Sequence, residues 1–462
     1  MKSIFKYMLL MCLVPVFGIA QEKETPPAGG EPKGFALPEK DVFSLENGLS
    51  GVMVQWGSIP KATIQIVIKT GNINEGADEV WLSDLVGDLM QEGSINRTGN
   101  EIADQVASMG GDLSIGVGQH STTLNVSVLY EFVPKALELM ADVLINPAFP
   151  EDELERLIND RKRQLSVSMT QPQSQAVSQF YGAIYPDHPY GRTFPTDEML
   201  DTYNLDKIKN FYSSNFGAKR TTVYVAGKFD EGEVKAAIEN SFKDWIVGEE
   251  ANYPVAEPQL ADNIQMIDRP DAPQSTIMIG LPVADPSSPD YQALDITNSL
   301  LGGSFGSRIT SNIREDKGYT YSPYSTISDR YKSAVWFEMA DVTTDVTGPA
   351  LREITKEIYR LQDEAPSVEE LDGIKNYEAG IYVLQNSTPG GIIGQLSYLD
   401  IYDLPESFLT DKVKNIYAVT PEQVSELVSK YIRPEDMKVV IVGDKKKIEE
   451  QIKDYEKEFG GN

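Results

Sequence analysis

The 462-residue chain has one cysteine and only two histidines. The cysteine, Cys12, lies in an N-terminal segment that we predict to be removed, so the mature chain would have no disulfide, thiolate nucleophile or thiolate metal site. The histidines, His120 and His188, are far apart in the sequence, and neither has an acidic neighbour at the spacing of helical zinc ligands. The sequence therefore excludes zinc hydrolysis by a two-histidine helix.

Basic residues are also scarce. The chain has 41 Lys and Arg against 70 Asp and Glu, which gives a formal net charge of −29. Loss of the N-terminal segment would remove two lysines and no acid, and 39 − 70 = −31 would remain. Such a chain repels phosphate backbones and anionic lipid surfaces, so we expect no nucleic-acid partner. The acidity suits basic peptides, but a solvated anionic surface is the simpler interpretation.

The chain has few long apolar runs, and the main one is at the N-terminus. Lys2 and Lys6 precede an apolar run over residues 7–20 that ends in small residues, a pattern typical of a secretory signal peptide. This run is too short to span a bilayer as a helix, and no later segment is long enough. We therefore predict a signal peptide at 1–20 and a soluble, secreted chain without a membrane span, located in a bacterial periplasm or released.

The sequence repeats itself with an offset of about 216 residues. Residues 205–229 and 421–445 each read as a helix, a short polar turn, an apolar strand and a glycine. The offset relates these pairs: Gly227 and Gly443, Ile208 and Val424, Phe211 and Leu427, and Pro150 and Pro366. Such ordered matches predict a tandem duplication.

The duplication defines the predicted domain organisation. Each half mixes alternating strand patterns, such as TTLNVSVL, with amphipathic helices, such as those expected at 132–144 and 151–168. The fold class is therefore α+β, with two tandem homologous domains, each a mixed sheet packed with helices, facing one another as a clamshell. We expect a signal peptide at 1–20, a flexible linker at 21–37, an N-terminal domain at 38–246, a second linker at 247–261 and a C-terminal domain at 262–460.

Several short motifs occur in order along the chain: LENGL, EDELERL, HPYGR, LLGGSFGSR and REDKGYTY, together with the helix–strand unit that ends each half. This set resembles the inverted-zincin metallopeptidases of the pitrilysin and insulinase family, over roughly residues 40 to 460. The resemblance implies the family's peptidase-like metallohydrolase fold. In active members, a helix carries H-x-x-E-H, both histidines and a later glutamate bind zinc, and the first glutamate is the general base.

The corresponding stretch here is WLSDLVGDLMQEGS (81–94), whose apolar spacing predicts a helix. By resemblance, Asp84, Gly87 and Asp88 occupy the His, Glu and His positions, and the family spacing places the later ligand at Gln164. Every element of the motif is replaced, so we expect no catalytic residue and no bound metal in this chain alone. Gly87 also has no side chain that could take a proton from water.

Two other interpretations involve these polar residues. Asp84, Asp88 and Gln164 could bind a hard cation through oxygen atoms, but the sequence offers no further ligands, and we favour a degenerate site. Whether the two aspartates bind any cation stays open. We interpret His120 and His188 as structural residues, because the sequence nominates no nucleophile beside them.

The second half contains LLGGSFGSRITSNIREDKGYTYSPYS, which predicts a flexible glycine loop, a helix and then a turn at Gly318. The resemblance implies that Arg314 and Tyr321 bind the substrate backbone and help to stabilise the tetrahedral intermediate. Both are suitable donors to a developing oxyanion. We assign Gly302 and Gly303 to the same substrate-binding segment.

Structural roles remain open for the same residues. Arg314 could form a surface ion pair with Glu315 or another acid, and Tyr321 could be a half-buried strand aromatic. The glycines could form a helix-capping turn. A phosphate-binding loop is a poor alternative, because no G-x-x-x-x-G-K-[ST] motif is present and the loop contains no lysine.

One half thus carries candidate substrate-binding residues, and the other half lacks the catalytic motif. This combination suggests that a second chain supplies the catalytic residues. Our first hypothesis is a non-catalytic subunit of a secreted heterodimeric zinc metallopeptidase that acts on peptides. The partner would be a homologous subunit that carries H-x-x-E-H and the zinc, and this chain would need no cofactor. The alternative is a stand-alone peptide-binding or scaffolding protein with no proteolytic role.

Overall fold

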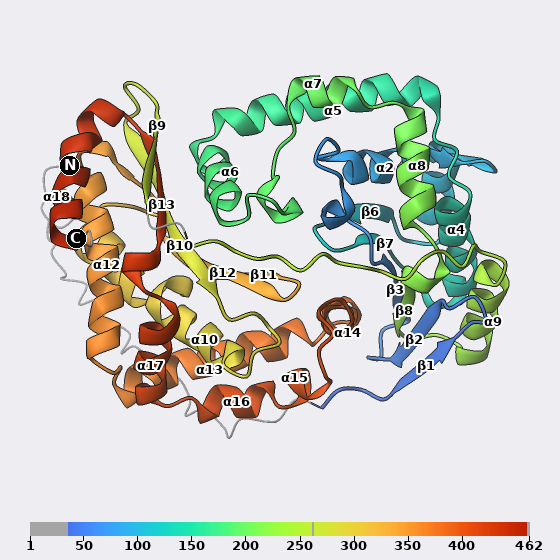
Figure 1. Cartoon of the computed structure of the whole chain (residues 1–462). Helices are drawn as coiled ribbons and strands as arrows, with labels where there is room; N and C mark the ends of the chain where they lie inside the picture. Colours follow the sequence, from blue (N-terminus) through green and yellow to red (C-terminus); the bar gives the residue numbers. More distant parts are fainter. Residues whose placement is uncertain (1–35, 261–262, 460–462) are drawn as a thin grey trace, which may run out of the picture. The chain divides into compact units, whose positions relative to one another are not determined.

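The computed structural model describes residues 36–260 and 263–459. The predicted signal peptide at 1–20 lies outside the described residues, as does nearly all of the predicted linker at 21–37. The described residues form two large mixed β-sheets with helices packed against them (Figure 1), and a small two-stranded sheet of β4 (Gly93–Ser94) and β5 (Arg97–Thr98). The predicted α+β class with two similar halves is confirmed.

The N-terminal half contains a six-stranded sheet with the order β1-β2-β8-β3-β7-β6. Only the β2–β8 pair is parallel, so the sheet is mixed. The strands are β1 (Lys40–Ser44), β2 (Ser50–Gln55), β3 (Lys61–Ile68), β6 (Leu113–Val117), β7 (Thr122–Leu129) and β8 (Thr221–Gly227). The main helices are α2 (Leu82–Gln91), α3 (Gly99–Ser108), α4 (Val133–Ile145), α5 (Glu151–Thr170), α6 (Pro172–Ile184), α8 (Leu205–Asn215) and α9 (Glu231–Phe242).

The C-terminal half contains a five-stranded sheet with the order β11-β12-β10-β13-β9, in which β13 and β9 are parallel. Its strands are β9 (Ile264–Asp268), β10 (Gln274–Val283), β11 (Tyr324–Arg330), β12 (Ser333–Thr343) and β13 (Lys438–Gly443). Its main helices are α10 (Tyr291–Asn298), α12 (Thr347–Asp363), α13 (Val368–Gln385), α14 (Pro389–Tyr402), α16 (Lys412–Ala418), α17 (Pro421–Tyr431) and α18 (Lys445–Phe459). Two π-helical segments, η5 (Ser299–Gly303) and η6 (Ser311–Asp316), flank the short helix α11 (Arg308–Thr310).

The internal repeat is visible as matching elements. The units α8–β8 and α17–β13 occupy the two predicted repeat segments, and Ile208 and Val424 are both fully buried. The helices expected at 132–144 and 151–168 are α4 and α5. Gly227 has φ +128°, and a Cβ there would lie 2.4 Å from a backbone oxygen of β3. A glycine therefore ends β8 for a steric reason.

The two halves exchange helices. Helix α6, which follows α5, packs on β10 and β13 of the other half. Its Phe180 is fully buried in a cluster with Met278 and Phe337, and the centroids of the two phenylalanine rings are 6.3 Å apart. Figure 1 shows α6 in green beside the yellow strands of the second sheet. A helix of the first half thus completes the core of the second.

Helix α14, which follows α13, makes the reciprocal contact with β3 and β8. Its Ile393 is buried in a cluster with Val67 and Tyr224 of the N-terminal sheet. At the edge of this contact, Lys69 Nζ lies 2.9 Å from Asp400 Oδ1. The apolar faces of both exchanged helices are therefore buried by the opposite half.

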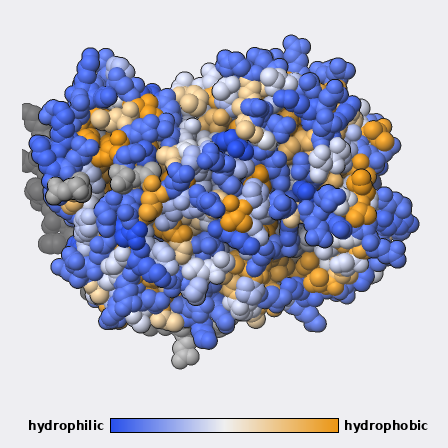
Figure 2. All heavy atoms as spheres, viewed as in Figure 1, coloured by the Kyte–Doolittle hydropathy of each residue, from blue (hydrophilic) through white to orange (hydrophobic). Residues whose placement is uncertain are grey.

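The visible surface is largely hydrophilic (Figure 2). Figure 2 shows hydrophilic residues over most of the visible face, interrupted by small apolar patches. Within residues 36–260 and 263–459, no helix is both long and apolar enough to cross a bilayer.

The helix exchange predicts that each half depends on the other for stability. Because Phe180 and Ile393 are fully buried in the opposite half's core, we expect Phe180→Ala to lower the free energy of unfolding by about 4 kcal/mol and Ile393→Ala by about 3 kcal/mol. Urea unfolding followed by circular dichroism measures both changes. Val167→Ala, at an exposed position of α5, is the control and should change little. Unchanged stability in Phe180→Ala would contradict this account.

Candidate functional site

Helix α2 carries the residues at the family's zinc positions. Leu82, Leu85 and Leu89 are fully buried and fix one face of the helix on the sheet. The first turn is capped by Glu75 from the preceding segment. Its carboxylate accepts hydrogen bonds from the backbone N–H groups of Trp81 (3.1 Å) and Ser83 (2.9 Å). A negative charge at a helix N-terminus satisfies free N–H groups and interacts favourably with the helix dipole.

Glu75 has an unusual protonation equilibrium. Burial raises the pKa of its carboxyl to about 7, and the nearby Asp84 carboxylate acts in the same direction. Hydrogen bonds from Ser83 and Asn72 oppose this rise without cancelling it. Glu75 is thus a buried acid beside the degenerate site, although its oxygens are already engaged in capping α2.

The centre of the degenerate site is occupied by a guanidinium group. Arg161 of α5 donates from Nε to Asp88 Oδ2 at 2.8 Å, and its Nη1 lies 3.4 Å from Asp84 Oδ1. Nη1 also donates to Gln164 Oε1 at 3.2 Å. The structure therefore brings Asp84, Asp88 and Gln164 together, as the resemblance implied, but around an arginine of the same chain.

Neighbouring groups complete this network. Asn72 Nδ2 donates to Asp84 Oδ2 at 2.7 Å, and the Arg161 guanidinium carbon lies 6.0 Å from the centroid of the Trp81 ring. Burial raises the pKa of Asp84, while the Arg161 cation lowers it. The arginine supplies the positive charge that two carboxylates one helical turn apart require.

These residues do not fit a zinc ion. The position of the general base is Gly87, where a Cβ would lie 2.8 Å from Val117 Cγ2, so even the first atom of a side chain lacks space. The site has no imidazole or thiolate, and the guanidinium holds the carboxylates. Among the described residues, no group of three or more His, Cys, Asp or Glu side chains is placed to hold a metal ion.

The two histidines connect separate segments of the fold. His120 Nε2 lies 2.7 Å from the Tyr190 hydroxyl and accepts from the backbone N–H of Tyr331 at 3.2 Å. Burial lowers the pKa of His120 to about 3, so the ring is neutral. His188 Nδ1 accepts from the backbone N–H of Tyr190, and its Nε2 lies 3.0 Å from the Pro254 oxygen. These contacts agree with structural roles.

In the C-terminal half, Arg314 lies in η6. Its Nε is 3.1 Å from Glu315 Oε1, which is the ion pair considered from the sequence, and its guanidinium carbon lies 4.6 Å from the centroid of the Phe305 ring. The chain then turns at Gly318, where φ is +65°, and reaches Tyr321. The Tyr321 side chain is 84% exposed and precedes β11, so a half-buried strand aromatic was the wrong alternative.

The expected role of Arg314 and Tyr321 in substrate binding stays a prediction. Both offer hydrogen-bond donors to solvent, since the Arg314 side chain remains 32% exposed and Tyr321 is almost free of protein contact. The described part of the chain therefore leaves both groups accessible to a peptide.

The glycines differ from expectation. Gly302 and Gly303 do not form a flexible loop; they end the π-helical segment η5, and the irregular stretch is 304–307. The reason is packing, because Leu300 and Leu301 are buried and hold the segment helical. A role for Gly302 and Gly303 in substrate binding stays a prediction.

Close contacts explain why these positions are glycines. A Cβ on Gly302 would lie 2.6 Å from both Glu338 Oε2 and Ser325 Oγ, and one on Gly303 would lie 2.6 Å from Asn298 Nδ2. Glu338 is fully buried on β12. Its carboxyl accepts no hydrogen bond of ordinary geometry from the described residues. Burial raises its pKa well above 4.5, and the Tyr324 backbone acts in the opposite direction without cancelling this rise.

Sequence reasoning did not identify Arg161 or Glu338. A signal for Arg161 was available, because it precedes Gln164 by three residues and so shares its helix face. For Glu338 the signal was a single acid within the apolar strand SAVWFEMADV. Neither signal resembles a known motif.

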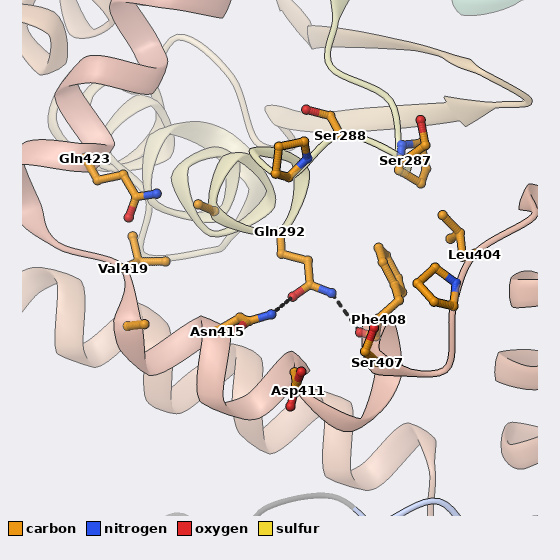
Figure 3. Close-up of a pocket in the computed structure, with 15 residues that line it drawn as sticks. Ser287, Ser288, Gln292, Leu404, Ser407, Phe408, Asp411, Asn415, Val419 and Gln423 are labelled. Carbon is orange, nitrogen blue, oxygen red and sulfur yellow. Dashed lines mark hydrogen bonds between the residues drawn. The ribbon is translucent and has the colours of Figure 1, made fainter.

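A separate pocket of about 440 Å³ lies in the C-terminal half, between residues 286–293 and 404–423 (Figure 3). Gln292 crosses it, donating from Nε2 to the Phe408 oxygen at 2.7 Å and accepting from Asn415 Nδ2 at 2.8 Å. Asp411 is the one ionisable side chain that lines it among the described residues. The pocket therefore offers no acid–base pair.

Known proteins share both the sequence pattern and the fold. A family model described as Insulinase (Peptidase family M16) matches residues 52–197, and one described as Peptidase M16 inactive domain matches residues 202–377. An uncharacterized zinc protease of Rickettsia bellii is 25% identical over 332 residues, which cover 71% of this chain and 80% of that protein. Another, from Bacillus subtilis, is 21% identical over 391 residues, with coverages of 83% and 94%.

Two solved structures have the same fold. A peptidase M16 inactive domain from Pseudomonas fluorescens aligns with a TM-score of 0.80 and 22% identity, covering 87% of this chain and 98% of that one. A protease from Helicobacter pylori aligns with a TM-score of 0.82 and 19% identity, covering 88% of this chain and all of that one. At these identities the likeness concerns the fold alone.

The Arg161 network predicts a charge-dependent stability. Arg161→Met would leave Asp84 and Asp88 close together without a cation, so we expect the free energy of unfolding to fall by about 2 kcal/mol. Asp84→Asn and Asp88→Asn added to this variant should restore part of the loss. The control is Arg163→Met on the same helix, whose side chain is 69% exposed. Urea unfolding measures all four proteins, and equal stability of Arg161→Met and wild type would contradict the network.

Glu338 predicts a pH dependence. Because its pKa is raised in the folded state, the unfolded chain loses this proton at lower pH than the folded chain does. Its contribution to stability therefore falls as pH rises above about 4.5. Glu338→Gln removes this loss, so the variant should gain stability relative to wild type between about pH 5 and pH 8. Urea midpoints across this range test it, with exposed Glu449→Gln as the control; parallel curves for Glu338→Gln and wild type would refute it.

Proposed function

Because the chain belongs to the insulinase (M16) family of peptidases, we propose that it is the non-catalytic subunit of a heterodimeric zinc metallopeptidase. A homologous partner carries H-x-x-E-H and binds the zinc ion, which activates water for peptide hydrolysis. This chain closes one side of the chamber that holds the peptide. We also propose that it is secreted, to a bacterial periplasm or beyond, which the apolar segment at 7–20 supports.

The observation that carries this proposal is the guanidinium of Arg161 among the residues at the family's ligand positions. A guanidinium group at this place has no open coordination position. It can therefore neither act as a Lewis acid nor activate a water molecule. Gly87 also leaves the position of the general base without a proton acceptor. Peptide hydrolysis therefore needs a second chain.

The contribution of this chain to catalysis is assigned to Arg314 and Tyr321. Arg314 packs over the ring of Phe305, which is 69% exposed, pairs through Nε with Glu315 and keeps 32% of its side chain exposed. Among the described residues, none accepts a hydrogen bond from the Tyr321 hydroxyl, and that side chain is 84% exposed. Charged and phenolic donors directed at a peptide carbonyl stabilise the negative charge that develops on its oxygen during hydrolysis.

The test is reconstitution with a homologous H-x-x-E-H chain from the same genome. We expect the pair to cleave an extended peptide and this chain alone to cleave none. Arg314→Gln and Tyr321→Phe should each lower kcat/KM by about a hundredfold, because each removes a donor to the oxyanion. Size-exclusion chromatography should show unchanged assembly. Tyr377→Phe, at an exposed tyrosine of α13, is the matched control.

Two outcomes would overturn parts of the proposal. Chelator-sensitive cleavage by this chain alone would refute a non-catalytic role. Normal turnover in Arg314→Gln and Tyr321→Phe would refute the assignment of these residues. Peptide binding by this chain, together with no turnover when a homologous H-x-x-E-H chain is supplied, would instead favour a stand-alone peptide-binding or scaffolding protein.

A further inference from the structure

A cavity of about 310 Å³ lies where α6 of the N-terminal half meets β11 and β12 of the C-terminal half. Its walls include Val177, Phe194, Ser322, Tyr324, Met339 and Asp341. The volume is at the lower end of the range for ligand pockets, which suits one long side chain rather than a whole cofactor.

The cavity lies between the two candidate sites. On one side, the Phe194 ring packs edge-on against Trp81, with 5.8 Å between ring centroids, and Trp81 in turn contacts Arg161 of the degenerate site. On the other side, Ser322 directly follows Tyr321 in the sequence. A peptide that contacts Tyr321 therefore passes next to the cavity.

The cavity walls are mainly apolar, but they include one carboxylate. Asp341 Oδ1 accepts from Thr276 Oγ1 at 2.5 Å, and Oδ2 accepts from Gln173 Nε2 at 2.7 Å. Both donors are neutral, and within residues 36–260 and 263–459 no lysine or arginine pairs with Asp341. A carboxylate has about four acceptor sites, so two neutral hydrogen bonds leave both its charge and part of its accepting capacity free.

This combination favours one class of ligand group. An arginine side chain has an apolar stem, a planar cation that stacks on aromatic rings, and donors that match a carboxylate. Phe194 and Tyr324 supply aromatic surface, Met339 and Val177 supply apolar surface, and Asp341 supplies the charge. The net charge of −29 also attracts basic peptides from a distance.

We propose that this cavity binds an arginine side chain of a bound peptide, with Asp341 as its ionic partner. The inference rests on the proposed peptide binding and goes beyond it by naming the residue that is selected. An acidic side chain would be repelled by the Asp341 carboxylate. A short apolar side chain would leave that carboxylate without a cationic partner, so neither should be selected.

The experiment uses the full mature chain without any partner. Two fluorescein-labelled octapeptides of Ala, Ser and Gly are compared, one with a single central arginine and one with citrulline, which has nearly the same shape but no charge. Fluorescence anisotropy should give a Kd about tenfold lower for the arginine peptide. In Asp341→Asn the two peptides should bind equally, because asparagine has no charge. Its Oδ1 can still accept from Thr276, and its Nδ2 can donate to the Gln173 side-chain oxygen once that amide turns over.

Two controls separate the cavity from general electrostatics. Asp363→Asn, at an exposed residue of α12, removes the same charge elsewhere and should keep the preference for arginine. The Met339 methyl group, followed by ¹³C NMR and assigned with Met339→Leu, should shift with the arginine peptide and not with the citrulline peptide. Both results would locate the binding at the cavity.

Several results would overturn the proposal. These are equal binding of both peptides by wild type, equal loss of the preference in Asp341→Asn and Asp363→Asn, or no binding of either peptide at about 1 mM. Because no partner is present, these outcomes are independent of the subunit proposal. If this chain alone prefers the arginine peptide, the arginine-binding cavity is supported and the heterodimer stays untouched. If a reconstituted pair is active and Asp341→Asn does not change its activity, the heterodimer is supported and the arginine-binding cavity is not.

Discussion

The reciprocal packing of α6 and α14 is the constraint on which the rest of the structure depends. Each helix leaves its own half and buries its apolar face on the other half's sheet, as Phe180 and Ile393 show. This fixes the distance between the two sheets. The cavity beside Tyr324 exists because α6 reaches β12, and the residues after it, including His188, are held against the segment that joins the halves.

The polar face of α2 is held together by charge pairing with α5. Two carboxylates on one helical turn destabilise each other unless a cation lies between them. In this chain the guanidinium of Arg161 lies between Asp84 and Asp88 and leaves no open coordination position. The helix therefore stays in place, and the surface that it presents is complete without a metal.

Much of the fold was predictable from the sequence, and less of the site. The repeat between Gly227 and Gly443 gave the two halves, because buried positions recur at a fixed offset. The clustering of Asp84 with Gln164 followed from the family spacing. Arg161 was missed because its two ionic partners, Asp84 and Asp88, are on another helix. Gly302 was misread because a local pattern of glycines does not reveal that Glu338 packs against Gly302 from a distant strand.

The position of Arg161 also bears on any attempt to build a metal site into this chain. A zinc site on α2 needs imidazoles in place of Asp84 and Asp88, and Arg161 must be replaced so that two cations do not meet. A carboxylate at Gly87 needs Val117 to move as well. Replacing one aspartate by histidine leaves the other paired with Arg161, so the guanidinium still occupies the place of a metal until Arg161 itself is changed. An engineered zinc site therefore requires coordinated changes on α2, α5 and β6.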